Sequence, residues 1–248
     1  MNAAVRLARG LATDATKPLY GTVPPHSSYL FFRSNEPPSA FPVKIFTQLQ
    51  RELLLRTFKL GIIVNWAWTG EPHDLPEGET SATMFSTKGG RLEIPRIALE
   101  NMDDVGARVK AHIEKKTPEP GTDEQIHLYI CTHGARDCRC GERGGEFARA
   151  LKEETERRSL GHRVKVREVG HVGGHRYAAN LLVYPHGEWL GQLRSEDAPH
   201  VLDEILALPV RPFTLKDPPA APTHWRGRTG LGKDEQIDLF ESHFHKTS

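Results

Sequence analysis

Two cysteines and two histidines have the residue types and the spacing to bind a metal. Cys131 and Cys140 are separated by eight residues, and His171 and His175 follow about thirty residues later. Each pair begins directly after a predicted strand, so two loops at the same end of adjacent strands can present all four side chains to one point. Thiolate and imidazole suit zinc and iron–sulfur centres. The pattern indicates a metal site, and a tetrahedral Cys2His2 zinc site is the main competing interpretation.

The histidine pair is expected in a tight loop. A spacing of four would place both rings on one face of a helix, but Gly173 and Gly174 lie between them and disfavour a helix. Two histidines in a loop are, by themselves, more often solvated, and a lone cysteine at a strand end is more often buried and inert. The four residues together, in two strand-end loops, favour metal binding over these alternatives.

The overall composition excludes several classes of protein. The 248 residues include 33 basic and 32 acidic side chains, which is no basis for an electrostatic grip on nucleic acid. The longest nearly apolar run, Leu60–Trp68, is far shorter than the roughly 20 residues that span a bilayer. Three clustered cysteines do not make a secreted disulfide scaffold. We expect a soluble protein with no membrane span and no nucleic-acid partner.

The first residues differ in character from those that follow. Residues 1–18 contain Arg6 and Arg9, and no acidic residue occurs before Asp14. A short, arginine-bearing, acid-poor start is typical of mitochondrial transit segments. We therefore predict a mitochondrial location, with a cytoplasmic location as the alternative.

The rest of the chain is predicted as two similar halves, over 19–120 and 121–210, with a linker at 117–122. Hydrophobic periodicity and turn residues predict the same order, β-α-β-β-β-α, in each half. The predicted strands are 29–32, 61–68, 83–87 and 91–96, then 126–131, 163–169, 180–184 and 188–193; the predicted helices are 43–58 and 100–115, then 144–158 and 197–207. This is the order of a thioredoxin-like unit, so the sequence predicts an α/β fold with two degenerate units in tandem.

Only the second half keeps metal-binding residues. A shift of 98 residues pairs Leu30 with Leu128 and also places Arg33 opposite Cys131. After residue 209 the chain becomes rich in proline, and we expect 211–248 to be a polar C-terminal tail that packs in part through Trp225 and Phe240.

The two motifs resemble those of the sucrase/ferredoxin-like family. Residues 131–141 read CTHGARDCRCG and residues 171–180 read HVGGHRYAAN. The pattern Cys-x8-Cys followed by His-x3-His resembles the bis-histidinyl branch of the thioredoxin-like ferredoxins, where ordinary members carry Cys-x3-Cys in place of the histidines. The sequence of residues 20–26 and 37–42 is similar to the corresponding segments of mitochondrial fungal members. The resemblance covers about residues 20–210.

This resemblance implies a thioredoxin-like ferredoxin fold and one [2Fe–2S] cluster. By the family pattern, Cys131 and Cys140 would bind one iron, and His171 and His175 the other. Cys138 falls outside the ligand spacing and would be spare. The function implied is that of an electron carrier or redox-responsive protein rather than an enzyme with its own substrate. Its expected partners are the iron–sulfur assembly machinery and a redox partner protein.

The ligand set also predicts redox behaviour. Two thiolates and two neutral imidazoles leave the oxidised cluster core uncharged, whereas four thiolates make it a dianion. The potential should therefore lie above the roughly −400 mV of plant-type ferredoxins, and imidazole ring protons should couple it to pH. Two other classes stay open: a zinc-stabilised thioredoxin-like interaction module, and a thiol oxidoreductase that works through Cys138 and Cys140.

Two further motifs are discounted. Cys131-Thr-His133 imitates half of a Rieske site, but no histidine follows Cys140 closely, so His133 is predicted to be a hydrogen-bonding residue beside the ligands or a surface residue. The segment 227–233 fits the Gly-x4-Gly-Lys core of a phosphate-binding loop. Asp234 replaces the Ser or Thr that binds Mg²⁺, and no strand is predicted before the loop, so we do not expect nucleotide binding.

Overall fold

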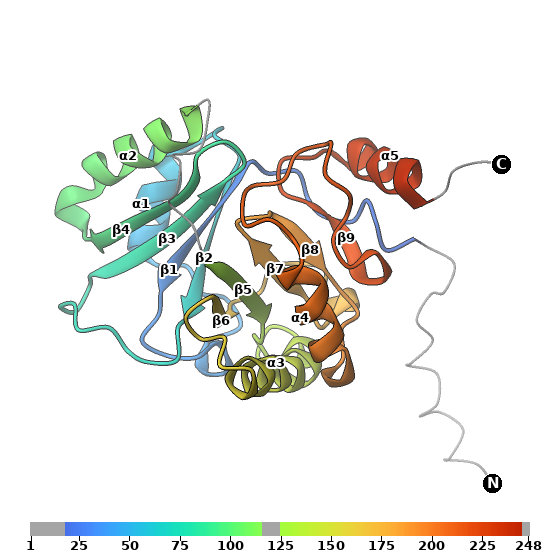
Figure 1. Ribbon diagram of the computed structural model, residues 1–248. Coiled ribbons are helices and arrows are strands. Elements are labelled where there is room, and N and C mark those ends of the chain that lie inside the picture. Colours follow the sequence, from blue (N-terminus) through green and yellow to red (C-terminus); the bar gives the residue numbers. More distant parts are fainter. Residues whose placement is uncertain (1–17, 116–124, 245–248) are drawn as a thin grey trace, which may run out of the picture.

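The computed structural model describes residues 18–115 and 125–244. The strands are β1 Ser28–Arg33, β2 Ile62–Trp68, β3 Thr80–Ser86, β4 Gly90–Ile97, β5 Ile126–Cys131, β6 Val164–Val169, β7 Leu181–Tyr184, β8 Glu188–Leu190 and β9 Trp225–Arg228. The α-helices are α1 Gln48–Arg56, α2 Met102–Glu114, α3 Gly145–Arg157, α4 Ala198–Leu206 and α5 Lys233–Phe244. The strands form one mixed sheet in the order β4-β3-β1-β2-β6-β5-β7-β8-β9 (Figure 1). Within the described ranges, no helix is long and apolar enough to cross a membrane.

Strand pairing is the same in the two halves. β1 is parallel to β2 and antiparallel to β3, which pairs with β4. In the second half β5 is parallel to β6 and antiparallel to β7, which pairs with β8. The predicted α/β class and thioredoxin-like order of elements are confirmed, and the tandem origin of the halves stays a prediction. The predicted linker at 117–122 and residues 1–17 of the predicted transit segment lie outside the described residues.

Most predicted elements occur with shorter bounds. The predicted helix 43–58 begins only at Gln48, because Thr47 has an extended backbone and its side chain accepts a hydrogen bond from the amide of Gln50. This is the geometry of a helix N-cap, so the helix begins after Thr47 and not earlier in the chain.

Each pair of helices covers one face of its own half of the sheet. Alternate β1 residues Leu30 and Phe32 pack with α1 and α2, and alternate β5 residues Leu128 and Ile130 pack with α3 and α4. Figure 1 shows these helices beside β1–β4 and β5–β8 respectively. Side chains that alternate along a strand point to opposite faces, so the intervening residues must face elsewhere.

The intervening residues form a third core between the two halves. The rings of Phe31 and Tyr129 stack with centroids 3.7 Å apart, and those of Phe85 and Tyr184 stack at 4.5 Å. The halves also join where β2 pairs with the end of β6. The separate ranges 19–120 and 121–210 did not predict this shared aromatic core. Cys131 and Cys140 belong to the same cluster of buried residues.

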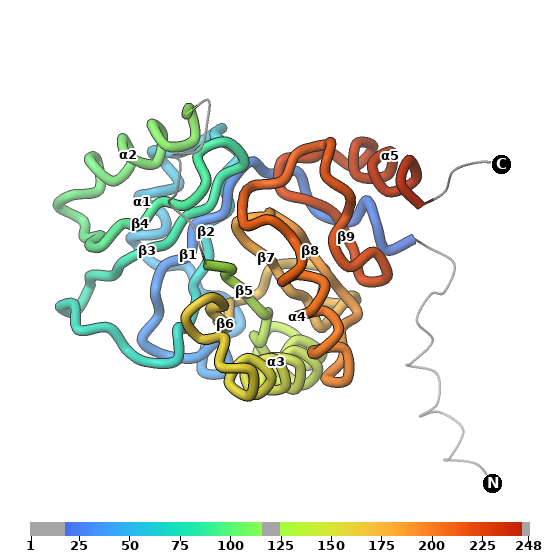
Figure 2. Tube along the Cα trace, viewed as in Figure 1, coloured from blue at the N-terminus to red at the C-terminus, as the bar shows by residue number. Residues whose placement is uncertain are grey.

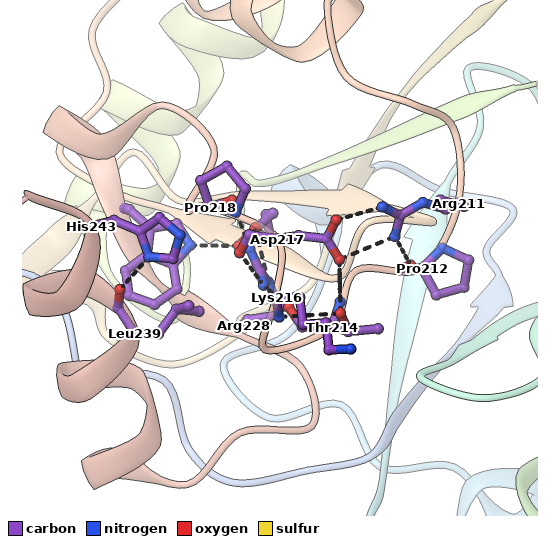
Figure 3. A network of polar contacts seen from close by, with 11 residues as sticks. Arg211, Pro212, Thr214, Lys216, Asp217, Pro218, Arg228, Leu239 and His243 are labelled. Carbon is purple, nitrogen blue, oxygen red and sulfur yellow. Dashed lines mark hydrogen bonds and ion pairs between the residues drawn. The ribbon is translucent and has the colours of Figure 1, made fainter.

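The segment after residue 210 is an ordered part of the sheet rather than a polar tail, although Trp225 and Phe240 pack as predicted. β9 pairs with β8 and extends the sheet, with Trp225 fully buried. The Arg228 guanidinium forms a buried ion pair with Glu188 and donates to backbone oxygens of the 214–218 segment, as Figure 3 shows for Thr214 and Pro218. The described N-terminal residues run beside this region (Figure 2), and the amide of Thr22 donates to the Arg226 carbonyl at 3.2 Å. Burial of an indole and an ion pair requires ordered packing.

A strand does lead into the glycine-rich segment 227–233, contrary to the prediction: β9 includes its first two residues, and α5 begins at its last residue, Lys233. Nucleotide binding is nevertheless disfavoured, because a phosphate cradle needs free backbone amides. The loop amides already have protein acceptors: Thr229 donates to Gly187, Gly230 to His26, Leu231 to Arg228 and Gly232 to the Glu235 carboxylate.

Candidate metal centre

The two motif-bearing loops leave neighbouring parallel strands. β5 ends at Cys131, which is in register with Val169 at the end of β6. Because both strands run in the same direction, the loops after them start from the same edge of the sheet. The first loop leads to Cys140 at the start of a π-helical turn that continues into α3, and the second carries both histidines.

Three of the four predicted ligands converge. The Sγ atoms of Cys131 and Cys140 and a ring nitrogen of His171 all lie within 4.8 Å of one another. The Cys140 Sγ is 3.8 Å from the His171 Nδ1. His175 lies beside this group, with its ring centroid 5.7 Å from that of His171.

The four side chains differ in their contact with solvent. Cys131 is only 1% exposed and Cys140 is fully buried, whereas the His175 side chain is 49% exposed. The His175 Nδ1 is 3.9 Å from an Asp137 carboxylate oxygen. The thiols therefore form the buried side of the site, and the histidine loop forms its solvent side.

Glycines allow the cysteine-bearing segments to approach closely. A Cβ atom on Gly144 would lie 2.1 Å from the carbonyl oxygen of Cys131, and one on Gly141 would lie 2.7 Å from the Cα of Gly134. Any larger residue at either position would meet backbone atoms rather than a movable side chain. These glycines therefore hold the end of β5 against the start of the helix and keep the two thiols together.

The two thiols are electrostatically distinct. A hydrogen bond from the Cys140 thiol lowers the pKa of Cys131 well below its usual value, despite burial, with further bonds from His171 and the amides of Val172 and His133. The same thiol–thiol bond and burial raise the pKa of Cys140. One thiol thus ionises readily, which suits a metal-binding pair because the thiolate is the ligand form.

The N-terminal half anchors the histidine loop. The Asn65 side-chain amide donates to the carbonyl oxygens of Gly170 (3.2 Å) and His171 (3.3 Å). The amide of His171 also donates to the Nδ1 of His133, so the His133 Nε2 carries the proton and donates to the Pro42 carbonyl at 2.9 Å. His133 is buried. The predicted role of His133 as a hydrogen-bonding residue beside the ligands agrees with this geometry.

Cys138 is exposed and lies outside the group of three ligand atoms. Its neighbour Asp137 accepts hydrogen bonds from the Arg139 side chain and amide, and these bonds lower the pKa of Asp137 to about 2. That Cys138 is a spare cysteine stays a prediction.

Sequence reasoning missed three residues that hold the loops. Asn65 in β2 donates to the Gly170 carbonyl at the start of the histidine loop. Asn180, just before β7, donates to the Gly174 carbonyl, and Arg226 in β9 donates to the Asn180 side chain. Asn180 closes the second quoted motif, but its role depends on partners distant in sequence. For Arg226 the only local signal was its place directly before the glycine-rich segment 227–233.

Residues 19–227 match the sequence model of one family, described as sucrase/ferredoxin-like. The chain belongs to the sucrase/ferredoxin-like family. The match covers both halves of the sheet and β9 as far as Gly227, so the family region includes the segment that contributes Arg226.

Individual relatives match shorter stretches. The chain is similar to "Altered inheritance of mitochondria protein 32" of Meyerozyma guilliermondii, with 38% identity over 88 residues, which is 34% of this chain and 30% of that protein. It is 28% identical over 107 residues to "Actin patches distal protein 1" of Saccharomyces cerevisiae, covering 38% of this chain and 34% of that protein. The chain thus matches about a third of the length of these curated relatives.

One solved structure with a low similarity is a thioredoxin-like [2Fe–2S] ferredoxin from Aquifex aeolicus. It shares 22% identity and a TM-score of 0.31, over 34% of this chain and 82% of that one. A likeness this low does not assign site residues.

Proposed function

We propose that this protein binds one [2Fe–2S] cluster through Cys131, Cys140, His171 and His175 and acts as an electron carrier or redox-responsive protein. The observation that carries the proposal is the convergence of both thiols and the His171 ring within 4.8 Å, with His175 stacked beside His171. Membership of the sucrase/ferredoxin-like family supports it. The proposed role needs only the cluster site, so we do not propose an enzyme with its own substrate.

The donor chemistry fits such a cluster. The three converging atoms are two sulfurs and one nitrogen, with no carboxylate oxygen among them. Thiolate and imidazole hold iron–sulfur clusters, and two of each occur on known [2Fe–2S] centres. When bound, the cluster supplies a one-electron redox couple.

The buried and the exposed residues of the site have different roles. The buried thiols provide anionic ligands away from water, and Gly144 keeps their backbones in contact. The His175 side chain is 49% exposed, so the histidine side of the site is open to solvent. Asp137 lies 3.9 Å from the His175 ring and can orient it, since carboxylates commonly position ligating imidazoles.

A zinc-stabilised interaction module is the second candidate. The three converging atoms also suit a single tetrahedral ion, to which His175 would be the fourth ligand. A thiol oxidoreductase acting through Cys138 and Cys140 is less favoured, because Cys140 is buried in contact with Cys131 while Cys138 is exposed.

Metal analysis separates the candidates. Freshly purified protein should be brown-red and contain close to two irons and two acid-labile sulfides per chain. Colourless protein with stoichiometric zinc would refute the cluster and support the second candidate. Protein with neither metal and a reactive Cys138 would favour thiol chemistry.

We also propose a location and partners for this protein. Relatives named for altered mitochondrial inheritance and the arginine-bearing start support a mitochondrial location. Residues 1–18 fused to a reporter should direct it to mitochondria, and a cytosolic reporter would refute this. The proposed partners are the iron–sulfur assembly machinery and an acidic redox protein, since Arg136 and Arg176 are exposed on the two motif-bearing loops.

A further inference from the structure

Arg226 is a fully buried arginine without an acidic partner. Its residue exposure is 1%, and none of the described carboxylates forms an ion pair with it. Its donors reach the Thr22 hydroxyl (3.1 Å), the Thr22 carbonyl (3.0 Å) and the Asn180 side-chain oxygen (2.7 Å). Its guanidinium also lies over the Tyr177 ring, 4.6 Å from the centroid. A buried charge with only neutral partners lowers the stability of the fold, so we expect this charge to have a role at the neighbouring site.

Arg226 contacts both motif-bearing loops through one intermediate residue. The Asn180 carbonyl accepts the amide proton of Cys131 at 3.1 Å, while the Asn180 side chain accepts from Arg226 and donates to the Gly174 carbonyl at 3.2 Å. Gly174 has a φ of +66°, and a Cβ atom there would lie 2.5 Å from the Arg226 Nη2. The guanidinium therefore lies directly beneath the backbone that carries His175.

The charge of Arg226 persists at neutral pH and interacts with the site. Burial lowers the pKa of Arg226 to about 10, and the nearby Cys131 thiolate acts in the opposite direction. In a low-dielectric interior this attraction is weakly screened. A positive charge here favours every state of the site that carries more negative charge.

We propose that Arg226 is the buried countercharge of the cluster site and raises its reduction potential. This inference rests on the proposed cluster binding. Arg226 is a positioning residue as well. Its guanidinium is a planar fork of N–H donors, and this fork holds Asn180 and the 173–175 backbone in place. The two roles can be separated, because a lysine keeps the charge and loses the fork.

Arg228 provides a matched control on the same strand. It is equally buried, but its partner is the buried carboxylate of Glu188. Burial raises the pKa of Glu188, so loss of Arg228 should leave that carboxyl protonated and the local net charge unchanged. Removing Arg226 has no such compensation.

The test is the midpoint potential at fixed pH, measured with iron content and thermal unfolding on the full chain. Arg226→Gln should lower the potential, while Arg226→Lys and Arg228→Gln should stay close to the unmodified protein. If Arg226→Gln does not fold, Asn180→Asp places a carboxylate against the guanidinium. It should lower the potential relative to Asn180→Ala, which removes the same amide without adding charge.

The outcomes distinguish this inference from the proposed function. An unchanged potential in folded Arg226→Gln, or equal potentials in Asn180→Asp and Asn180→Ala, overturns the role of Arg226 and leaves cluster binding intact. A fall in Arg226→Lys as large as in Arg226→Gln also overturns it, because only the fork would then matter. Unmodified protein without iron refutes cluster binding and this inference together.

Discussion

Two adjacent glycines at the start of α3 should respond to alanine in opposite ways. Gly144 lies against the Cys131 carbonyl, where an added Cβ would be 2.1 Å from the oxygen, whereas a Cβ on Gly145 would meet no atom within 4 Å. Both residues have helical backbone angles, so neither substitution is opposed by its own φ and ψ. Only the contact with β5 distinguishes Gly144→Ala from Gly145→Ala.

The magnitudes follow from this contact. Gly145→Ala should stabilise the protein by up to about 1 kcal/mol, the difference in helix propensity. Gly144→Ala gains no more than that and must displace backbone, and overpacking of this kind costs about 1–3 kcal/mol or more. We expect a net loss of about 2 kcal/mol, which corresponds to a fall in Tm of roughly 4–8 °C for a chain of this size. Relief of the contact should also separate Cys131 from Cys140 and lower the affinity of the site for its metal.

Urea unfolding of both variants beside the unmodified protein gives the free energies, and iron content after gel filtration reports on the site. The expected result is a destabilised, iron-poor Gly144→Ala and a fully loaded Gly145→Ala of equal or greater stability. If Gly144→Ala is as stable and as iron-rich as Gly145→Ala, the close approach of β5 and α3 does not hold the thiols together.

Three further outcomes are expected. The midpoint potential should fall as pH rises, by up to about 59 mV per pH unit where one proton accompanies one electron, and His171→Cys or His175→Cys should lower it and flatten its pH dependence; a flat profile in the unmodified protein argues against histidine ligation. Cys138→Ser should retain the visible spectrum while Cys140→Ser loses it, and the reverse result would reassign the ligand. Asn65→Ala should lower the free energy of unfolding by about 1–3 kcal/mol and speed cluster loss at room temperature, and an unchanged rate of bleaching would mean that other contacts hold the histidine loop.

Local patterns in the sequence predicted most of the elements. Strand alternation in 126–131 and helical spacing in 144–158 both depend on a few neighbouring residues, and β5 and α3 lie where they were expected. The β9 strand was missed because Trp225–Arg228 is short and carries two arginines, which are unusual in a buried strand. Its strand character comes from pairing with β8 and from the partners Glu188 and Asn180 of the two guanidinium groups, which are 40 or more residues away.

The sequence alone determined the chemistry of the site. The types and spacing of Cys131, Cys140, His171 and His175 predicted a sulfur and imidazole donor set after two strands, because ligand chemistry belongs to the side chain itself. Only the tertiary structure decided that three donor atoms converge while His175 stays half-exposed, and that Arg226 lies beneath the histidine loop. These features arise because β5 pairs with β6 and β9 pairs with β8 in one sheet, so that segments nearly a hundred residues apart in the chain serve one site. Such long-range contacts depend on the packing of the whole sheet rather than on any local pattern.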